Sequence, residues 1–243
     1  LLDIPPELPA AVPHLGAGGG LCYLSKGTVV LDIYDPVGQS LACLQRAAVV
    51  LGQILKGGMI EDLTEEFFAY WDGWLCFVDM QGEDLGRQSC IIAQANGNSL
   101  WFITDNKDRT TKKLKSLGYQ ITDQTVLTYR IKTSAQPRPL TSHWPPETVA
   151  DILAWQSTLD PRCRRKIHAR IKEGERKKAN GVLIVIESLL MTYGFAVLYD
   201  RQCQVQKGKL ADRRDSSYGL KAIPVSVVRI DDRYLAQRNI PKS

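Results

Sequence analysis

PHLGAGGGLCYLSKGTVVLDIYDP, residues 13–36, is the stretch from which the organisation of this chain is predicted. Four of the five residues at positions 16–20 are glycine, and Cys22 follows them. Because glycine has no Cβ, another polypeptide can approach the backbone beside this thiol closely. Cys22 is therefore the first candidate for a reactive residue.

A helix is predicted directly after Asp35 and Pro36. Leucine and alanine recur there with i+3 and i+4 spacing, which is typical of a helix with one apolar face. The residues of this stripe are Leu41, Leu44, Ala48, Leu51 and Leu55. The pattern predicts a helix over residues 39–55, packed by this stripe onto a core with the Cys22 loop at its side.

The order of features in this stretch carries a family resemblance. His14, a glycine turn, Cys22 between Leu21 and Tyr23, and an Asp-Pro step before a helix follow one another. This order resembles the active-site segment of ubiquitin-conjugating enzymes. It is most similar to bacterial UBC-like proteins that are fused to, or encoded beside, a ThiF-type activating domain in CBASS antiphage operons. The detailed resemblance covers residues 4–56.

The resemblance implies an acyltransferase of the ubiquitin-like conjugation pathway. Cys22 would carry a ubiquitin-like tail, or the C-terminus of a cyclic-nucleotide synthase, as a thioester and pass it to an amine. A ThiF-type activating enzyme or domain would be the partner that loads it. The role would belong to bacterial antiphage defence.

Roles for neighbouring residues are also implied by the resemblance. The eukaryotic family has a His-Pro-Asn triplet, whereas Leu15 and Gly16 follow His14 here, so the asparagine that helps to stabilise the oxyanion is absent. Backbone N–H groups of Gly18, Gly19 and Gly20 would take its place. His14 would hold the loop by hydrogen bonds. Asp35 would orient the incoming amine, or else would cap the helix that follows.

Two functions of other classes stay open. The chain could be a catalytically inactive adaptor that keeps the conjugating fold as a docking surface. It could also be a cysteine hydrolase in which His143 or His168 serves Cys22 as the base.

Composition excludes several kinds of site. The six cysteines show no paired spacing and the three histidines are dispersed, so we expect reduced thiols and no metal. A Walker-type loop is absent, so no nucleotide cofactor is expected. Apolar runs are far too short for a membrane span. A cytoplasmic protein that uses no membrane is the resulting expectation.

The rest of the chain predicts alternating strands and helices. Residues 1–70 form the UBC-like conjugating segment, and strands at 74–78, 88–93 and 99–104 with a helix at 107–117 belong to a small α+β unit over 71–132. Four prolines mark residues 133–146 as a linker, and 147–243 form a second α+β unit. The fold class expected is α+β, with a UBC-like active-site segment whose front is missing or shortened, followed by a mixed α/β linker region.

A basic run lies in the second unit at residues 161–178. Nine of its eighteen residues are Lys or Arg and two are acidic. Arg165, Lys166 and Arg170 are candidates for binding an acidic partner. The alternative is a solvated helix face, with Ile167 and Ile171 turned inward. Because the run contains no Phe, Tyr or Trp for base stacking, nucleic acid is not favoured as the partner.

Overall fold

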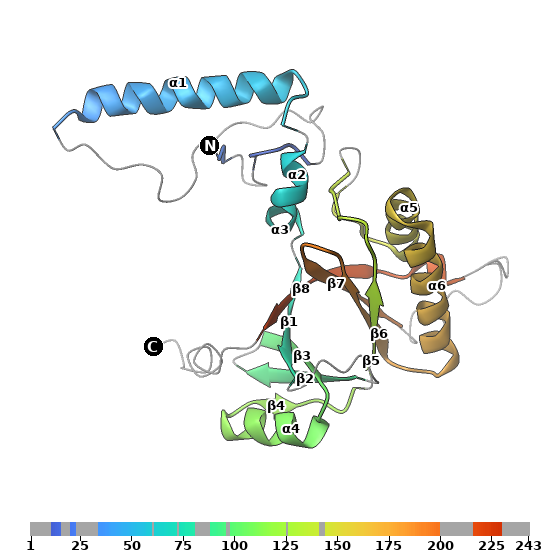
Figure 1. Ribbon diagram of the computed structural model, residues 1–243. Coiled ribbons are helices and arrows are strands. Elements are labelled where there is room, and N and C mark those ends of the chain that lie inside the picture. The colour runs from blue at the N-terminus through green and yellow to red at the C-terminus, as the bar shows by residue number, and fades with distance from the viewer. Residues whose placement is uncertain are drawn as a thin grey trace. The chain divides into compact units, whose positions relative to one another are not determined.

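The computed structural model describes residues 11–15, 20–22, 34–59, 61–71, 73–80, 88–95, 98–124, 126–140, 144–199 and 216–229 (Figure 1). The chain divides into two compact units. The first consists of residues 1–70 and 137–145, and the second of residues 71–136 and 146–243.

The second unit is built on a closed β-barrel. Its strands are β1 (Trp74–Asp79), β2 (Ser89–Ala95), β3 (Asn98–Thr104), β5 (Val126–Lys132), β6 (Gly181–Glu187), β7 (Thr192–Leu198) and β8 (Ala222–Arg229). They follow one another in the order β3-β1-β8-β7-β6-β5-β2, and pairing of β2 with β3 closes the ring. The short strand β4 (Gln120–Ile121) adds to β2 outside the ring.

The predicted α+β fold class, with a UBC-like active-site segment and a mixed α/β linker region, is wrong. Seven strands instead form a mixed barrel, in which β1–β3, β1–β8 and β5–β6 are parallel pairs and the other pairs are antiparallel. The physical reason is pairing across long sequence separations, since β5 and β6 flank the proline-rich segment and still lie side by side. Residues 71–132 and 147–243 thus contribute to one sheet. The predicted division into four parts, with boundaries after residues 70, 132 and 146, stays a prediction.

Alternate residues of every barrel strand point into one apolar interior. The buried set is Cys76, Cys90, Ile92, Trp101, Ile103, Val126, Leu183, Val185, Ala196 and Val225. The rings of Trp74 and Trp101 meet in this interior at a tilt of 40°, with centroids 5.0 Å apart. The period of two in the strand sequences therefore separates the barrel lumen from an outer face that helices can cover.

Three helices lie outside the barrel. Helix α4 (Lys107–Ser116) begins at an Asn106 cap and buries Leu114 against the outer face of β2 and β3. Helix α5 (Val149–Leu159) begins with a Thr148–Asp151 capping box. Helix α6 (Pro161–Arg176) follows at once, and α6 lies along β5 and β6 (Figure 1). The one-turn helix η1 (Ser216–Gly219) precedes β8.

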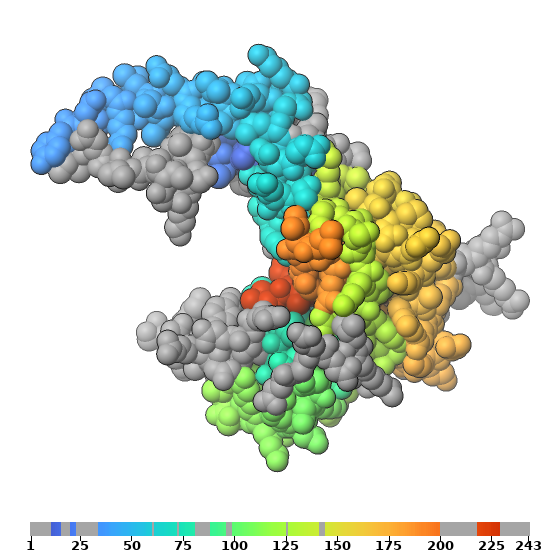
Figure 2. All heavy atoms as spheres, in the orientation of Figure 1, coloured from blue at the N-terminus to red at the C-terminus, as the bar shows by residue number. Residues whose placement is uncertain are grey.

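The first unit contains α1 (Pro36–Leu55), α2 (Asp62–Glu65) and α3 (Phe67–Tyr70). The predicted helix is present, but the prediction that its stripe packs onto a core is wrong. Leu41 and Leu44 are 55% and 67% exposed, and Val50 is the buried residue of α1. Figure 2 shows the α1 atoms in blue with much of the helix surface uncovered. An apolar stripe is buried only where another element covers it, and no described element covers this one.

The proline-rich segment packs onto the first unit. Pro137 and Pro139 are buried, and the Trp144 indole Nε1 donates to the Tyr70 carbonyl at 2.8 Å. The rings of Phe67 and Trp144 meet edge to face, 6.0 Å apart. These contacts make residues 137–145 part of a packed unit, although their composition predicts a linker.

Among the described residues, no helix combines the length and the apolar character needed to cross a membrane.

Candidate functional site around Cys22

A small closed turn presents Cys22. Leu15 and Leu21 form an antiparallel bridge, and the Cys22 amide donates to the His14 carbonyl at 2.7 Å. These two contacts join residues 14 and 15 to residues 21 and 22. Cys22 itself is exposed. Gly20 is also exposed, and a Cβ built on it would meet nothing within 4 Å, while Gly18 and Gly19 lie outside the described residues.

His14 is held between two carboxylates. Its Nε2 lies 3.0 Å from Asp62 Oδ2 and its Nδ1 lies 2.7 Å from Glu66 Oε1. The backbone N–H of His14 donates to the other Glu66 oxygen at 2.9 Å. His14 has φ 61°, in the left-handed region that histidine enters more readily than most residues. These contacts fix the residue whose carbonyl receives the Cys22 amide, and so they position the turn.

Tyr70 completes this cluster. Its hydroxyl donates to the Val12 carbonyl at 2.6 Å and lies 3.1 Å from Glu66. Burial and the neighbouring Glu66 carboxylate raise the pKa of Tyr70, so the phenol stays protonated and remains a donor. Asp62 on α2 and Glu66, the residue between α2 and α3, are thus the carboxylate partners of His14. The positioning role of His14 stays a prediction that these contacts support.

Sequence reasoning missed Asp62, Glu66 and Tyr70. A signal was present, because these residues recur every four positions and share one face of the helical stretch 61–70. An acidic face near a predicted loop histidine is an ion-pair candidate. The pairing partner, however, is 48 and 52 positions away in the chain.

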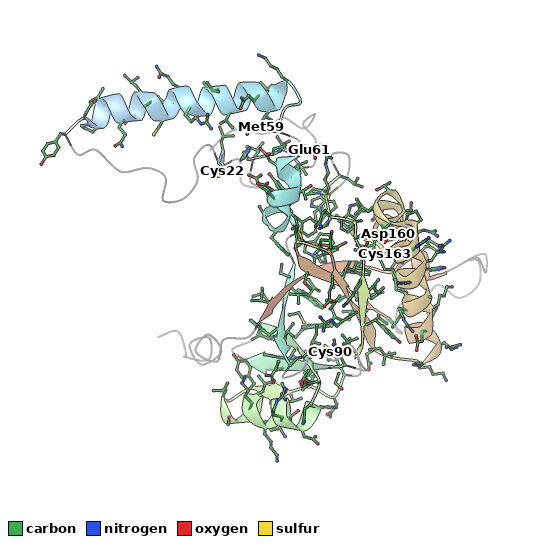
Figure 3. All side chains as sticks on the ribbon, in the orientation of Figure 1. Cys22, Met59, Glu61, Cys90, Asp160 and Cys163 are labelled. Atoms are coloured by element: carbon green, nitrogen blue, oxygen red, sulfur yellow. The ribbon has the colours of Figure 1, made fainter. Side chains whose placement is uncertain are left out.

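The other described cysteines occupy different environments. Cys76, Cys90 and Cys163 are buried. Burial raises the pKa of the Cys90 and Cys163 thiols to about 12, and raises that of Cys76 well above its ordinary value. Figure 3 shows the labelled Cys90 and Cys163 among the side chains of the barrel unit. Cys43 on α1 is half-buried, and Cys203 lies outside the described residues.

Asp35 is the N-cap of α1. Its Oδ1 accepts from the Gly38 amide at 2.9 Å, which satisfies one of the free N–H groups of the first turn. A Cβ on Gly38 would lie 2.1 Å from Asp35 Oδ2, so glycine gives the capping carboxylate its room. Asp35 thus has a structural role as the N-cap of α1. Its catalytic role stays a prediction.

The predicted basic residues lie on α6 in the second unit. Arg165 and Lys166 are exposed. Arg170 pairs with Glu173 at 2.7 Å and lies 4.8 Å over the Tyr129 ring. Of the other two histidines, His168 packs against Tyr218, whereas His143 lies outside the described residues.

Metal binding receives no support from the described part of the chain. Within those residues, no group of three or more His, Cys, Asp or Glu side chains is arranged to hold an ion.

Comparison with known proteins decides the relationship. Along all 243 residues, the chain is 86% identical to the ATP-dependent ubiquitin transferase-like protein Cap2 of Pseudomonas aeruginosa, strain BWHPSA011. This chain is a close homologue of part of Cap2. It spans 45% of the length of Cap2. The resemblance predicted from residues 13–36 is confirmed as a similarity to a bacterial ubiquitin transferase-like protein.

No family model matches the chain. No solved structure matches it either. The relationship to Cap2 therefore comes from sequence identity alone, and the residue that reacts has to be argued from the site.

Proposed function

We propose that this chain provides the thioester-forming cysteine of a ubiquitin transferase-like protein, and that this cysteine is Cys22. The single observation that carries the proposal is the exposed thiol on a turn fixed by the His14 cluster. Near-identity to Cap2, a ubiquitin transferase-like protein, supports the reaction class. The proposed acyl group is a ubiquitin-like tail or the C-terminus of a cyclic-nucleotide synthase.

The chemistry requires an accessible thiolate and a donor thioester. The Cys22 sulfur attacks the carbonyl carbon of the acyl group on an activating enzyme, and the thiolate of that enzyme leaves. An amine then attacks the new thioester, the Cys22 thiolate leaves, and the amine proton passes to solvent. Because a thiol replaces a thiol in the first step, little activation is needed. A few per cent of thiolate at neutral pH is sufficient.

Hydrolysis requires a base at the sulfur. The ring nitrogens of His14, the histidine closest to Cys22 in sequence, both face carboxylate oxygens. The His14 ring is therefore engaged by carboxylates and is not placed to act as that base. A hydrolase with His143 or His168 as its base stays the alternative.

The test is a loading reaction with a ThiF-type activating enzyme, ATP and the modifier. We expect the chain to gain the mass of the modifier in a form that a reducing thiol removes, since thiols exchange with thioesters and not with amides. Cys22→Ser should give a thiol-resistant oxyester or nothing, whereas Cys43→Ala, the matched control, should load normally. A Cys22→Ala chain that still supports antiphage defence would favour the adaptor role. Rapid loss of the adduct to water would favour the hydrolase.

A further inference from the structure

The positive charge of the chain is concentrated on one helix. Residues 161–178 carry nine basic and two acidic side chains, a net charge of +7. The whole chain has a formal net charge of +5, so the remaining 225 residues together are slightly acidic. A surface that concentrates one sign of charge in this way attracts a partner of the opposite sign.

Two cations of this helix pair with Glu173, and three others are exposed on its first two turns. Glu173 accepts from Arg170 and Lys177, and these two cations lower the pKa of the Glu173 carboxyl to about 2. Arg162, Arg165 and Lys166 recur at i, i+3 and i+4, are exposed, and lie along the first two turns of α6. We call these three residues the basic face.

A hollow adjoins the basic face. It has a volume of about 480 Å³, and Arg162, Arg165, Ser134 and Ala135 are among the residues that line it. Asp160 also lines it, and its two oxygens accept from the Thr133 hydroxyl and the Arg162 amide, both at 2.8 Å. One carboxylate is thus already present beside the two arginines. Two arginines therefore line the hollow together with the small residues Ser134 and Ala135.

We propose that the basic face docks an acidic segment of a protein partner, with one Glu or Asp side chain of that segment entering the hollow between Arg162 and Arg165. The guanidinium group suits this use because its planar fork of N–H donors matches a carboxylate. The proposal is independent of the chemistry at Cys22, which lies in the other unit.

A protein segment fits this surface better than a nucleic acid does. Base stacking on a single strand needs exposed aromatic rings, and residues 161–178 contain none apart from His168. His168 packs against Tyr218 and is half-buried. Duplex DNA would be held by phosphate contacts alone. If charge alone governed binding to the basic face, DNA should bind more tightly than an acidic peptide, because its charge density is higher.

The test measures binding of a fluorescein-labelled peptide of alternating Glu and Ser to the full chain, beside its Gln counterpart. Duplex DNA of equal total charge is the third probe. We expect the Glu peptide to bind, the Gln peptide to bind at least about tenfold more weakly, and added salt to weaken the Glu complex. Tighter binding of the DNA than of the Glu peptide would overturn the proposal.

Variants locate the surface. Replacing Arg162, Arg165 and Lys166 by Glu should lower the affinity for the Glu peptide by about tenfold or more. A single exposed ion pair contributes little to binding, but three act together here. Reversal of Lys107, Lys112 and Lys115 on α4 makes the same charge change on exposed helical residues and serves as the matched control. An equal loss in the control would show diffuse attraction and refute the basic face.

A charge-neutral variant tests the hollow itself. Ser134 is exposed and lines the hollow, and Ser134→Trp adds a bulky side chain there without removing a cation. We expect this variant to bind the Glu peptide less tightly as well, while the circular dichroism spectrum of the variant stays unchanged. Unchanged affinity in Ser134→Trp would overturn the placement of a carboxylate in the hollow.

Discussion

His14→Asn tests how the Cys22 turn is held. Asparagine tolerates the left-handed backbone of position 14 about as well as histidine does, so the variant reports the loss of ring contacts rather than of backbone fit. Nδ1 and Nε2 lie 2.7 Å and 3.0 Å from carboxylate oxygens, and the shorter asparagine amide cannot span both. The bridge between Leu15 and Leu21 should then open more often.

The magnitude follows from the exposure of the two partners. The side chain of Glu66 is 24% exposed, so a charged hydrogen bond to it stabilises by about 1.5–3 kcal/mol. Asp62 is 37% exposed, and its pair with His14 contributes at most about 1 kcal/mol. With partial compensation by the amide, the loss should be about 2 kcal/mol, which is about thirtyfold in the opening equilibrium.

Hydrogen exchange followed by mass spectrometry is the appropriate assay, because the effect is local. Peptides that cover residues 11–22 should exchange about thirtyfold faster in His14→Asn, while barrel peptides are unchanged. His168→Asn, a histidine variant in the other unit, is the control and should leave residues 11–22 unaffected. Unaltered exchange of these residues in His14→Asn would refute the positioning role of the ring.

Three further predictions concern the thiols, the packing of α6 and the cap of α1. Because burial raises the pKa of Cys90 and Cys163 to about 12, their unfolded forms ionise first. The free energy of unfolding should therefore be unaffected below the ordinary thiol pKa of about 8.5 and fall from there towards pH 12 in urea titrations. Gly174→Ala puts a Cβ 2.2 Å from a valine methyl of β6 and should cost about 1–3 kcal/mol in the same assay, whereas Gly52→Ala, in open space, should be neutral or stabilising. Asp35→Ala should destabilise α1 by about 1 kcal/mol, seen as faster hydrogen exchange of its first turn, and Asp35→Asn by a few tenths.

Each of these has an outcome that contradicts it. Alkaline stability that is level or rises with pH would contradict the assignment of neutral buried thiols, and Cys22→Ala serves there as the control. Equal stability of the two alanine variants would show that α6 does not pack closely on β6. Slower acyl transfer to an amine in Asp35→Asn, with the cap intact, would assign Asp35 to catalysis rather than to capping.

Local patterns in the sequence predict most elements of the barrel unit. The strands expected at 74–78, 88–93 and 99–104 are present within a few residues, as is the α4 helix. Alternation of apolar residues is a local property, so it can be read from a short window. Barrel closure is not local, because it depends on which strands pair, and β1 meets a strand 151 positions further along the chain.

The candidate site shows the same division. Cys22 was predicted from its neighbours and lies exposed, and Asp35 was predicted as a cap or an acid and caps α1. The carboxylates around His14 come from a separate helical stretch, which no local pattern connects to position 14. The prediction that the apolar stripe of α1 is buried was wrong for a related reason. Its spacing states which residues share a face, and whether that face is covered depends on other elements.

Mapping the acyl site after loading measures the proposed chemistry most directly. The loaded chain would be digested without reducing agent and the remnant of the modifier located by tandem mass spectrometry. We expect the remnant on the peptide that contains Cys22, and its loss in Cys22→Ala while Cys43→Ala is unaffected. A thiol-sensitive remnant on a peptide containing Cys43, Cys90 or Cys203, persisting in Cys22→Ala, would contradict the assignment of Cys22 as the acyl carrier.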